Sequence, residues 1–316
     1  MSCYSPMKAY RPLSNIDGGR LVFNPAKALN PNNPISLPCG QCIGCRIASS
    51  QETATRCYHE SQMHPENAFV TLTFSDDHLP ENYSITKRDL QLFIKRLRKH
   101  CGTKKIRFFG SGEYGDNYGR PHYHALIFNH DFNDKQHYST CPHTNQKLYT
   151  SNSLSSLWTF GHSTTGAVTY QSAAYVARYI MKKINGDRAV DHYTRLHPLH
   201  LTYHQVEPEF VLRSGNLGYS WFQKYKSDCF PSDFLIVDGK HTRVPRYYDQ
   251  LLKKEEQPRP DAKFFEALNT PLYRLKKQRR ISSGAHAEDQ TPARLRVREF
   301  VKTSQLNRLQ RNLKDH

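Results

Sequence analysis

Long hydrophobic runs are missing from this sequence of 316 residues. No uninterrupted apolar run exceeds about five residues, whereas a membrane-spanning helix needs roughly 20. The segment MSCYSPMKAYRPL at the start of the sequence also lacks the apolar stretch of a secretory signal. We therefore expect neither a membrane protein nor a secreted one.

Acidic residues are scarce beside basic ones. The chain has 28 Asp and Glu against 45 Lys and Arg, which gives a net charge of +17. Such an excess of positive charge favours a polyanionic partner. General solubility is the alternative explanation, although acidic residues serve it better, and neither a basic amphipathic helix nor a lipidation signal stands out. Nucleic acid is the expected partner.

Apolar periodicity predicts the elements of one sizeable core. Residues 69–74 (FVTLTF) have the composition of a buried strand, and 106–109 and 121–128 are two further strand candidates joined by a glycine-rich loop. Residues 131–163 are polar and predict loops.

Two helices are predicted in the same region. The first begins after Thr86, which has Asp89 at the spacing of a capping box, and it ends before Gly102. Its apolar positions recur at i, i+3, i+4 and i+7, and they are Leu90, Phe93, Ile94 and Leu97. The second helix runs from about 170 to 184 and is closed by Asn-Gly.

These signals divide the chain into four expected parts. Residues 1–60 form an irregular arm with a cysteine-rich turn, 61–190 form the core, and 191–250 form a smaller α+β extension. Residues 251–316 carry 16 Lys and Arg against 8 Asp and Glu. We expect this tail to form helical pieces or a mobile basic segment on nucleic acid, the alternative being a solvated helix pair.

His122 and His124 are candidate metal ligands. In a strand, residues i and i+2 point to the same face, and Glu113 could return from the preceding strand to add a carboxylate. Two nitrogens and one oxygen suit Mn²⁺ or Mg²⁺ acting as a Lewis acid. A surface histidine pair on a sheet edge is the alternative.

Tyr175 and Tyr179 lie one turn apart on the second helix, with Lys182 three residues further on. The three side chains share a face beside an apolar stripe. Ordinary packing of an aromatic stripe is the alternative interpretation.

Cys39, Cys42 and Cys45 have the spacing of a zinc turn, with Cys57 or His59 near enough in sequence to be the fourth ligand. An iron–sulfur site lacks a fourth cysteine at close spacing. The remaining alternative is a redox-inert cluster packed under the arm. Without a secretory signal, the eight cysteines favour reduced thiols or metal ligands over disulfides.

The order of these motifs resembles a known family. TLTF, GRPHYHALIF and YVARYIMK, in this order, are similar to the three motifs of HUH endonucleases in the two-tyrosine form of rolling-circle initiators. CYSPMKA, CGQCIGCR and GEYG resemble the replication-associated proteins of microviruses, the gokushovirus branch in particular. The resemblance spans roughly residues 1–186.

The resemblance implies an α+β fold in which a central antiparallel sheet of about five strands, a ferredoxin-like or RRM-like palm, carries helices on one face. It assigns a catalytic Mg²⁺ or Mn²⁺ to His122, His124 and Glu113, and it makes Tyr175 and Tyr179 the nucleophiles with Lys182 as the lysine of that motif. The cysteine triplet, a possible structural Zn²⁺ site, is not required by the wider endonuclease family.

The implied activity is that of a phage replication initiator. It nicks the origin of a circular replicative DNA through a 5′-phosphotyrosine, leaves a 3′-hydroxyl for synthesis, then recleaves and joins the displaced strand. Viral origin DNA, single-stranded or extruded, is the implied substrate, and a host helicase and polymerase in the host cytoplasm are the implied partners. Tyr114, Tyr118 and Arg120 are expected to contact DNA bases and phosphates.

Three alternatives remain open at this point. A transposase or relaxase would share the chemistry, although relaxases usually place the nucleophile before the histidines. A non-enzymatic DNA-binding protein would bind single strands without forming a covalent product. A zinc-dependent regulator would use residues 39–59.

Overall fold

The computed structural model describes residues 3–13, 20–115, 119–140, 146–184, 186, 188–197, 200–230, 232–255 and 291–311. The chain divides into two compact units, Met1–Ser49 with Ser283–His316, and Ser50–Ser282. The boundary falls inside helix α1 (Ile43–Ser61).

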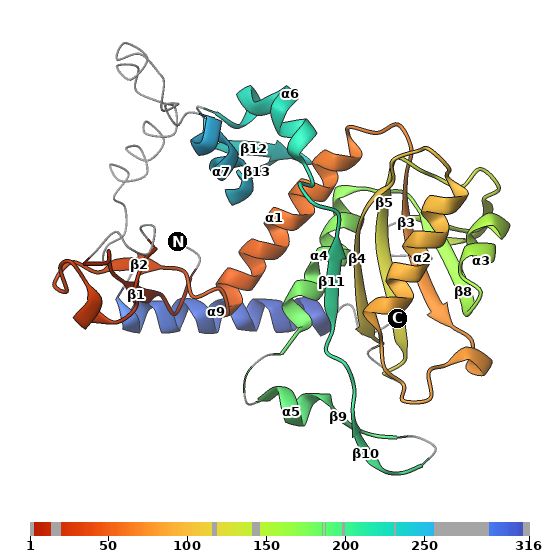
Figure 1. Cartoon of the computed structure of the whole chain (residues 1–316), viewed down its shortest axis with the longest axis horizontal. Helices are drawn as coiled ribbons and strands as arrows, with labels where there is room; N and C mark the ends of the chain where they lie inside the picture. The colour runs from red at the N-terminus through yellow and green to blue at the C-terminus, as the bar shows by residue number, and fades with distance from the viewer. Residues whose placement is uncertain are drawn as a thin grey trace. The chain divides into compact units, whose positions relative to one another are not determined.

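A seven-stranded antiparallel sheet lies at the centre of the unit Ser50–Ser282, in the order β11-β4-β5-β3-β8-β7-β6 (Figure 1). Its strands are β3 (Asn67–Phe74), β4 (Arg107–Tyr114), β5 (Pro121–Phe128), β6 (Gln136–Thr140), β7 (Lys147–Thr150), β8 (Gly161–Gly166) and β11 (Phe210–Arg213). The predicted α+β class with a central antiparallel sheet is confirmed. The sheet exceeds the expected five strands because β6 and β7 extend one edge and β11 the other.

Helices cover both faces of this sheet rather than one. The alternate residues Tyr123, Ala125 and Ile127 of β5 pack in one core with α2 (Lys87–His100), which crosses the near face in Figure 1. Leu126 and Phe128 pack in a second core with α4 (Tyr170–Lys182) and the second half of α1. The period of two along β5 thus separates two apolar cores, and His122 and His124 belong to the face of α4.

The two predicted helices have the expected termini. The Thr86 side chain accepts a hydrogen bond from the Asp89 backbone N–H at the start of α2, and Gly102 follows α2 with a positive φ of 60°. Thr169 and Ser172 form a reciprocal capping box at the start of α4. These caps fix where the buried stripe of each helix begins.

The prediction of loops over 131–163 is wrong. This segment contains β6, β7, the helix α3 (Asn152–Leu157) and the first residues of β8. Strand β6 is almost entirely exposed at the sheet edge, and β7 is only partly covered. Edge strands of this kind bury no alternate side chains, so no apolar periodicity marks them.

The chain after α4 adds smaller elements. They are α5 (Arg188–Tyr193), β9 (Thr194–Leu196), β10 (Tyr203–Gln205), α6 (Tyr219–Cys229), β12 (Phe234–Val237), β13 (Lys240–Arg243) and α7 (Arg246–Glu255). Strands β9 and β10 pair with each other, while α6, β12 and α7 enclose a third apolar core around Phe222, Trp221 and Tyr248.

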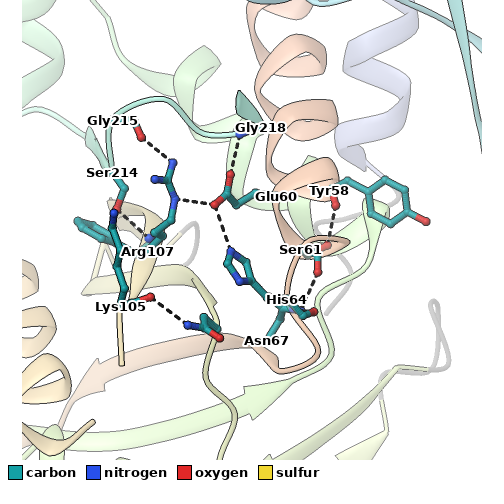
Figure 2. A network of polar contacts seen from close by, with 12 residues as sticks. Tyr58, Glu60, Ser61, His64, Asn67, Lys105, Arg107, Ser214, Gly215 and Gly218 are labelled. Carbon is teal, nitrogen blue, oxygen red and sulfur yellow. Dashed lines mark hydrogen bonds and ion pairs between the residues drawn. The ribbon is translucent and has the colours of Figure 1, made fainter. Parts of the chain in front are cut away.

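Glu60, at the end of α1, joins three parts of the unit Ser50–Ser282 (Figure 2). Its carboxylate meets Arg107 Nε of β4 at 2.5 Å and accepts the Gly218 backbone N–H at 2.7 Å, just before α6. His64 Nε2 lies 3.3 Å from the same carboxylate. These contacts attach the smaller elements to the central sheet beside the core of α4.

The other unit contains β1 (Met7–Ala9), β2 (Ile35–Leu37), the short 3₁₀ helix η2 (Pro25–Lys27) and α9 (Pro292–Arg311). Strands β1 and β2 pair antiparallel. Residues 256–290, on which much of the predicted basic tail falls, lie outside the described residues. In the part of the chain that the structure describes, no helix combines the length and the apolar character needed to cross a membrane.

Candidate metal and nucleophile site

Sheet register brings the predicted metal ligands together. Glu113 of β4 is the cross-strand partner of His122 of β5, and His124 follows two residues later on the same face. All three side chains therefore project toward α4, beyond the edge of the apolar core that Leu126 and Phe128 help to form. Directly opposed residues in an antiparallel pair have Cβ atoms about 5 Å apart, which is close enough for shared coordination.

The three ligand atoms converge on one point. Glu113 Oε1 lies 2.7 Å from His122 Nε2 and 3.0 Å from His124 Nε2. Glu113, His122 and His124 form one of the two groups among the described residues whose ligand atoms lie within 4.8 Å of one another. The structure thus brings together all three predicted ligands.

The far nitrogen of each imidazole is also held. His122 Nδ1 lies 3.1 Å from the Arg120 carbonyl oxygen, which only accepts, so Nδ1 carries a proton. His124 Nδ1 lies 3.0 Å from Thr71 Oγ1 on β3. With Nδ1 of His122 protonated, the lone pair of its Nε2 faces the carboxylate oxygen of Glu113, and only a proton or a metal ion between them removes the repulsion.

Electrostatics keep Glu113 ionised. Burial by itself raises the pKa of this carboxyl, but hydrogen bonds and positive charge from His122 and His124 outweigh burial and lower the pKa to about 2. A permanently charged carboxylate with two imidazole nitrogens is a donor set that suits Mn²⁺ or Mg²⁺. The residues present therefore fit a divalent cation.

Tyr175 and Tyr179 of α4 both contact His124. The Tyr179 ring stacks parallel to the imidazole with centroids 5.5 Å apart, and the Tyr175 ring lies edge-on at 5.2 Å. The two phenol rings are 5.3 Å apart. The predicted common face of the helix is thus turned toward the candidate metal ligands, while Ala173, Val176 and Ala177 of the same helix enter the core.

The two phenols have different surroundings. Tyr179 is 5% exposed, whereas Tyr175 is only partly buried. Burial raises the pKa of Tyr179 well above its usual value, and the negative charge of Glu113 raises it further. The side chain of Lys182, the third predicted residue of this motif, lies outside the described part of the chain.

The predicted DNA-contact residues fare differently. Tyr114 is 5% exposed, its hydroxyl donates to the Glu207 carbonyl at 2.7 Å, and the Arg195 guanidinium covers its ring. The prediction that Tyr114 contacts bases is therefore wrong. Arg120 forms an ion pair with Asp76 at 2.6 Å, and Tyr118 lies outside the described residues.

Cys39, Cys42 and Cys45 also lie together, but with a different fourth residue. Cys3 completes the second group of metal-capable side chains. The expected fourth ligands are elsewhere: Cys57 is buried in the core of α4, and His59 stacks on Trp221 at 3.5 Å. A ligand 36 residues before Cys39 leaves no local spacing signal.

Two residues were thus missed in the sequence. Thr71 orients His124, and only strand pairing reveals this contact, because Thr71 lies 53 positions away. Cys3 is likewise placed by pairing, since β1 and β2 bring the chain before Met7 back to the chain after Leu37.

Comparisons with known proteins agree with the site. A family model described as replication-associated protein ORF2 matches residues 67–184, which include both histidines and both tyrosines. Replication-associated protein VP4 of Bdellovibrio phage phiMH2K is 35% identical over 263 residues, covering 80% of this chain and 78% of that protein. Replication-associated protein ORF2 of Spiroplasma virus 4 is 32% identical over 279 residues, covering 81% and 82%. Replication-associated protein ORF4 of Chlamydia phage 1 is 30% identical over 247 residues, covering 75% and 59%.

No solved structure matches the chain. The sequence matches show that it belongs to the replication-associated proteins. Within this class it belongs with those of small phages, and the predicted resemblance to the microvirus proteins of the gokushovirus branch is confirmed.

Proposed function

We propose that this protein initiates rolling-circle replication by nicking the origin of a circular phage DNA through a tyrosine. The observation that carries the proposal is the direct contact of Tyr175 and Tyr179 with His124. A nucleophile and a metal site must meet the same phosphate, and this helix and this strand hold the two sets of side chains against each other.

The proposed reaction exchanges one phosphoester for another. A tyrosine Oη forms a bond to the scissile phosphorus, and the bond from phosphorus to the 3′-oxygen breaks. The phenol proton passes to solvent or a base, and the 3′-oxygen takes up a proton to become the hydroxyl that primes synthesis. Because the phosphotyrosine keeps the ester energy, the displaced strand can be joined without ATP.

A divalent cation held by Glu113, His122 and His124 supplies Lewis-acid polarisation of the scissile phosphate. The chain itself fixes the ligands: Arg120 and Thr71 orient the two imidazoles, and α4 excludes water from one side of them. Lys182 is proposed to add positive charge near the phosphate, as the family motif implies.

Two tyrosines permit two successive cleavages, one to open the origin and one to cut it again after a round of synthesis. Tyr175 is the more exposed of the two, and we expect it to attack first. Tyr179, with its raised pKa and its place under His124, then serves the second transfer.

The proposed substrate is viral origin DNA, single-stranded or extruded, because such a site accepts an unpaired strand. The net charge of +17 supports a polyanionic substrate. Host helicase and polymerase in the host cytoplasm are proposed to extend the 3′-end.

A covalent-adduct assay tests the proposal. Full-length protein is mixed with labelled single-stranded DNA from its own genome, with Mn²⁺ or with EDTA, and resolved on a denaturing gel. We expect a metal-dependent adduct that is reduced in Tyr175→Phe, lost in the Tyr175→Phe/Tyr179→Phe variant and lost in His122→Ala. Tyr170→Phe is the matched control, because Tyr170 opens the same helix.

An adduct that persists in the double tyrosine variant would overturn the assignment of the nucleophiles. Tight, salt-sensitive binding with no adduct on any genomic fragment would instead support a non-enzymatic DNA-binding protein.

A further inference from the structure

The unit Met1–Ser49 with Ser283–His316 has very little hydrophobic core. Apart from Cys3, its buried apolar residues, among those described, are Ala9, Tyr10, Ala28 and Leu295. Units with so few buried side chains are ordinarily held by a disulfide or a metal ion. The four cysteines of the unit are therefore candidates for a cross-link.

The four sulfurs are too far apart for disulfides and well spaced for a shared metal. Cys3, Cys39, Cys42 and Cys45 are all free thiols, and the Sγ atom of Cys3 lies 3.6 Å from that of Cys39 and 3.9 Å from that of Cys42. A disulfide requires about 2.05 Å. Zinc–sulfur bonds of about 2.3 Å in a tetrahedron place sulfurs about 3.8 Å apart.

Backbone N–H groups already point at three of these sulfurs. Tyr4 N lies 3.2 Å from Cys42 Sγ, Cys39 N lies 3.3 Å from Cys3 Sγ, and Cys42 N lies 3.2 Å from Cys39 Sγ. Hydrogen bonds to sulfur stabilise the thiolate form, and the thiolate is the form that binds metal. The chain thus provides the outer hydrogen bonds that orient metal ligands.

Local structure explains how the ligands meet. The pairing of Met7 with Leu37 brings Cys3 beside Cys39. Gly40, at φ 75°, takes the left-handed conformation that turns the chain between Cys39 and Cys42. Cys45 lies in the first turn of α1, where the positive end of the helix dipole favours anionic sulfur.

We propose that Cys3, Cys39, Cys42 and Cys45 form a closed tetrathiolate site that binds one Zn²⁺ and holds the β1–β2 pair to the start of α1. Thiolates select zinc over the Mg²⁺ or Mn²⁺ that suits the Glu-His-His site, because they are soft ligands. With four protein ligands the zinc has no open position and is structural.

Zinc content and cobalt spectroscopy test the proposal on the full-length chain. Because the Glu-His-His site can also bind these metals, the measurements are made in the His124→Ala background. We expect about one zinc per chain by mass spectrometry of the metal, and Co²⁺ substitution that gives thiolate charge-transfer and tetrahedral d–d bands. Cys42→Ser and Cys3→Ser should each lower the zinc content to about a tenth or less.

Two further variants keep the test decisive if the serine variants unfold. Cys101→Ser, in the other unit, should retain full zinc. Cys3→His, which replaces one ligand by another that zinc accepts, should retain zinc and shift the cobalt bands toward a three-sulfur, one-nitrogen site. Neither readout depends on DNA cleavage, so failure of the nicking proposal leaves this test intact.

Full zinc in Cys3→Ser, or no zinc and no cobalt thiolate band in the parent protein, would overturn the proposal. An iron–sulfide chromophore in anaerobically purified protein would overturn the choice of zinc.

Discussion

Two buried glutamates in the unit Ser50–Ser282 have much in common. Glu60 and Glu113 are each 2% exposed, and each carboxylate lies within hydrogen-bonding distance of histidine nitrogen. Burial raises the pKa of both carboxyls, yet their partners lower the pKa of both below the usual value. Burial and a lowered pKa therefore do not by themselves distinguish a functional carboxylate from a structural one.

The partners make the difference. Glu60 meets a guanidinium, which is permanently charged, and a backbone N–H, so its charge is compensated by groups that cannot bind metal. Glu113 meets two imidazoles, which are neutral metal ligands when their Nε2 atoms are unprotonated. The donor set around a buried carboxylate thus indicates whether it holds the fold or a cation.

Replacing Glu113 should produce the largest effect. Glu113→Gln removes the anionic ligand, and we expect the nicking rate to fall by about 1000-fold or more, because a Lewis-acid metal contributes several kcal/mol to such a transition state. The measurement is the single-turnover cleavage of labelled origin DNA in Mn²⁺. The matched control is Glu60→Gln, assayed well below its unfolding temperature, which should cleave at the parent rate. Equal losses in both variants would contradict the comparison.

Replacing Glu60 should change stability instead. Glu60→Gln leaves the Arg107 guanidinium without its carboxylate, and we expect the free energy of unfolding to fall by about 3 kcal/mol. Urea denaturation followed by circular dichroism measures this change. The Glu60→Gln/Arg107→Met variant should recover part of the loss, because it removes the uncompensated charge as well. A Glu113→Gln variant destabilised as strongly as Glu60→Gln would show that both carboxylates hold the fold.

The smallest effect is expected at Thr71. Thr71→Val removes the hydroxyl beside His124 Nδ1 while keeping the shape of the side chain, and we expect metal affinity to weaken about 10- to 100-fold. Titration of nicking activity with Mn²⁺ measures the change, and excess Mn²⁺ should restore the parent rate. Thr164→Val is the control, since Thr164 pairs with Thr71 from β8. A loss that excess Mn²⁺ does not restore would assign Thr71 to the fold.

Much of the site was predictable because its residues lie within strongly patterned elements. The strand 121–128 was predicted with the bounds that β5 has, and its period of two placed His122 and His124 on one face. The spacing of Tyr175 and Tyr179 placed both phenols on one helix face. In each case a local repeat fixes the direction of the side chain.

The rest depended on contacts distant in sequence. Thr71 and Cys3 acquire their roles through strand pairing, which no local pattern encodes. Tyr114 looked like a surface aromatic beside the site, but the strand continues through it, and its place in β4 turns it into the core of α2. Strands β6 and β7 were missed because their exposed side chains carry no apolar signal.

The pairing of Tyr114 with Pro121 has a consequence for recognising distant relatives. The ladder closes one position beyond the pair of Glu113 and His122, so the metal ligands are set by register and not by the number of residues in the connection that follows. Insertions or deletions in that connection should leave the ligands aligned. A search pattern that demands a fixed interval between the glutamate and the first histidine would therefore reject true relatives, whereas one that anchors the glutamate to the end of one strand and the histidines to the start of the next would retain them.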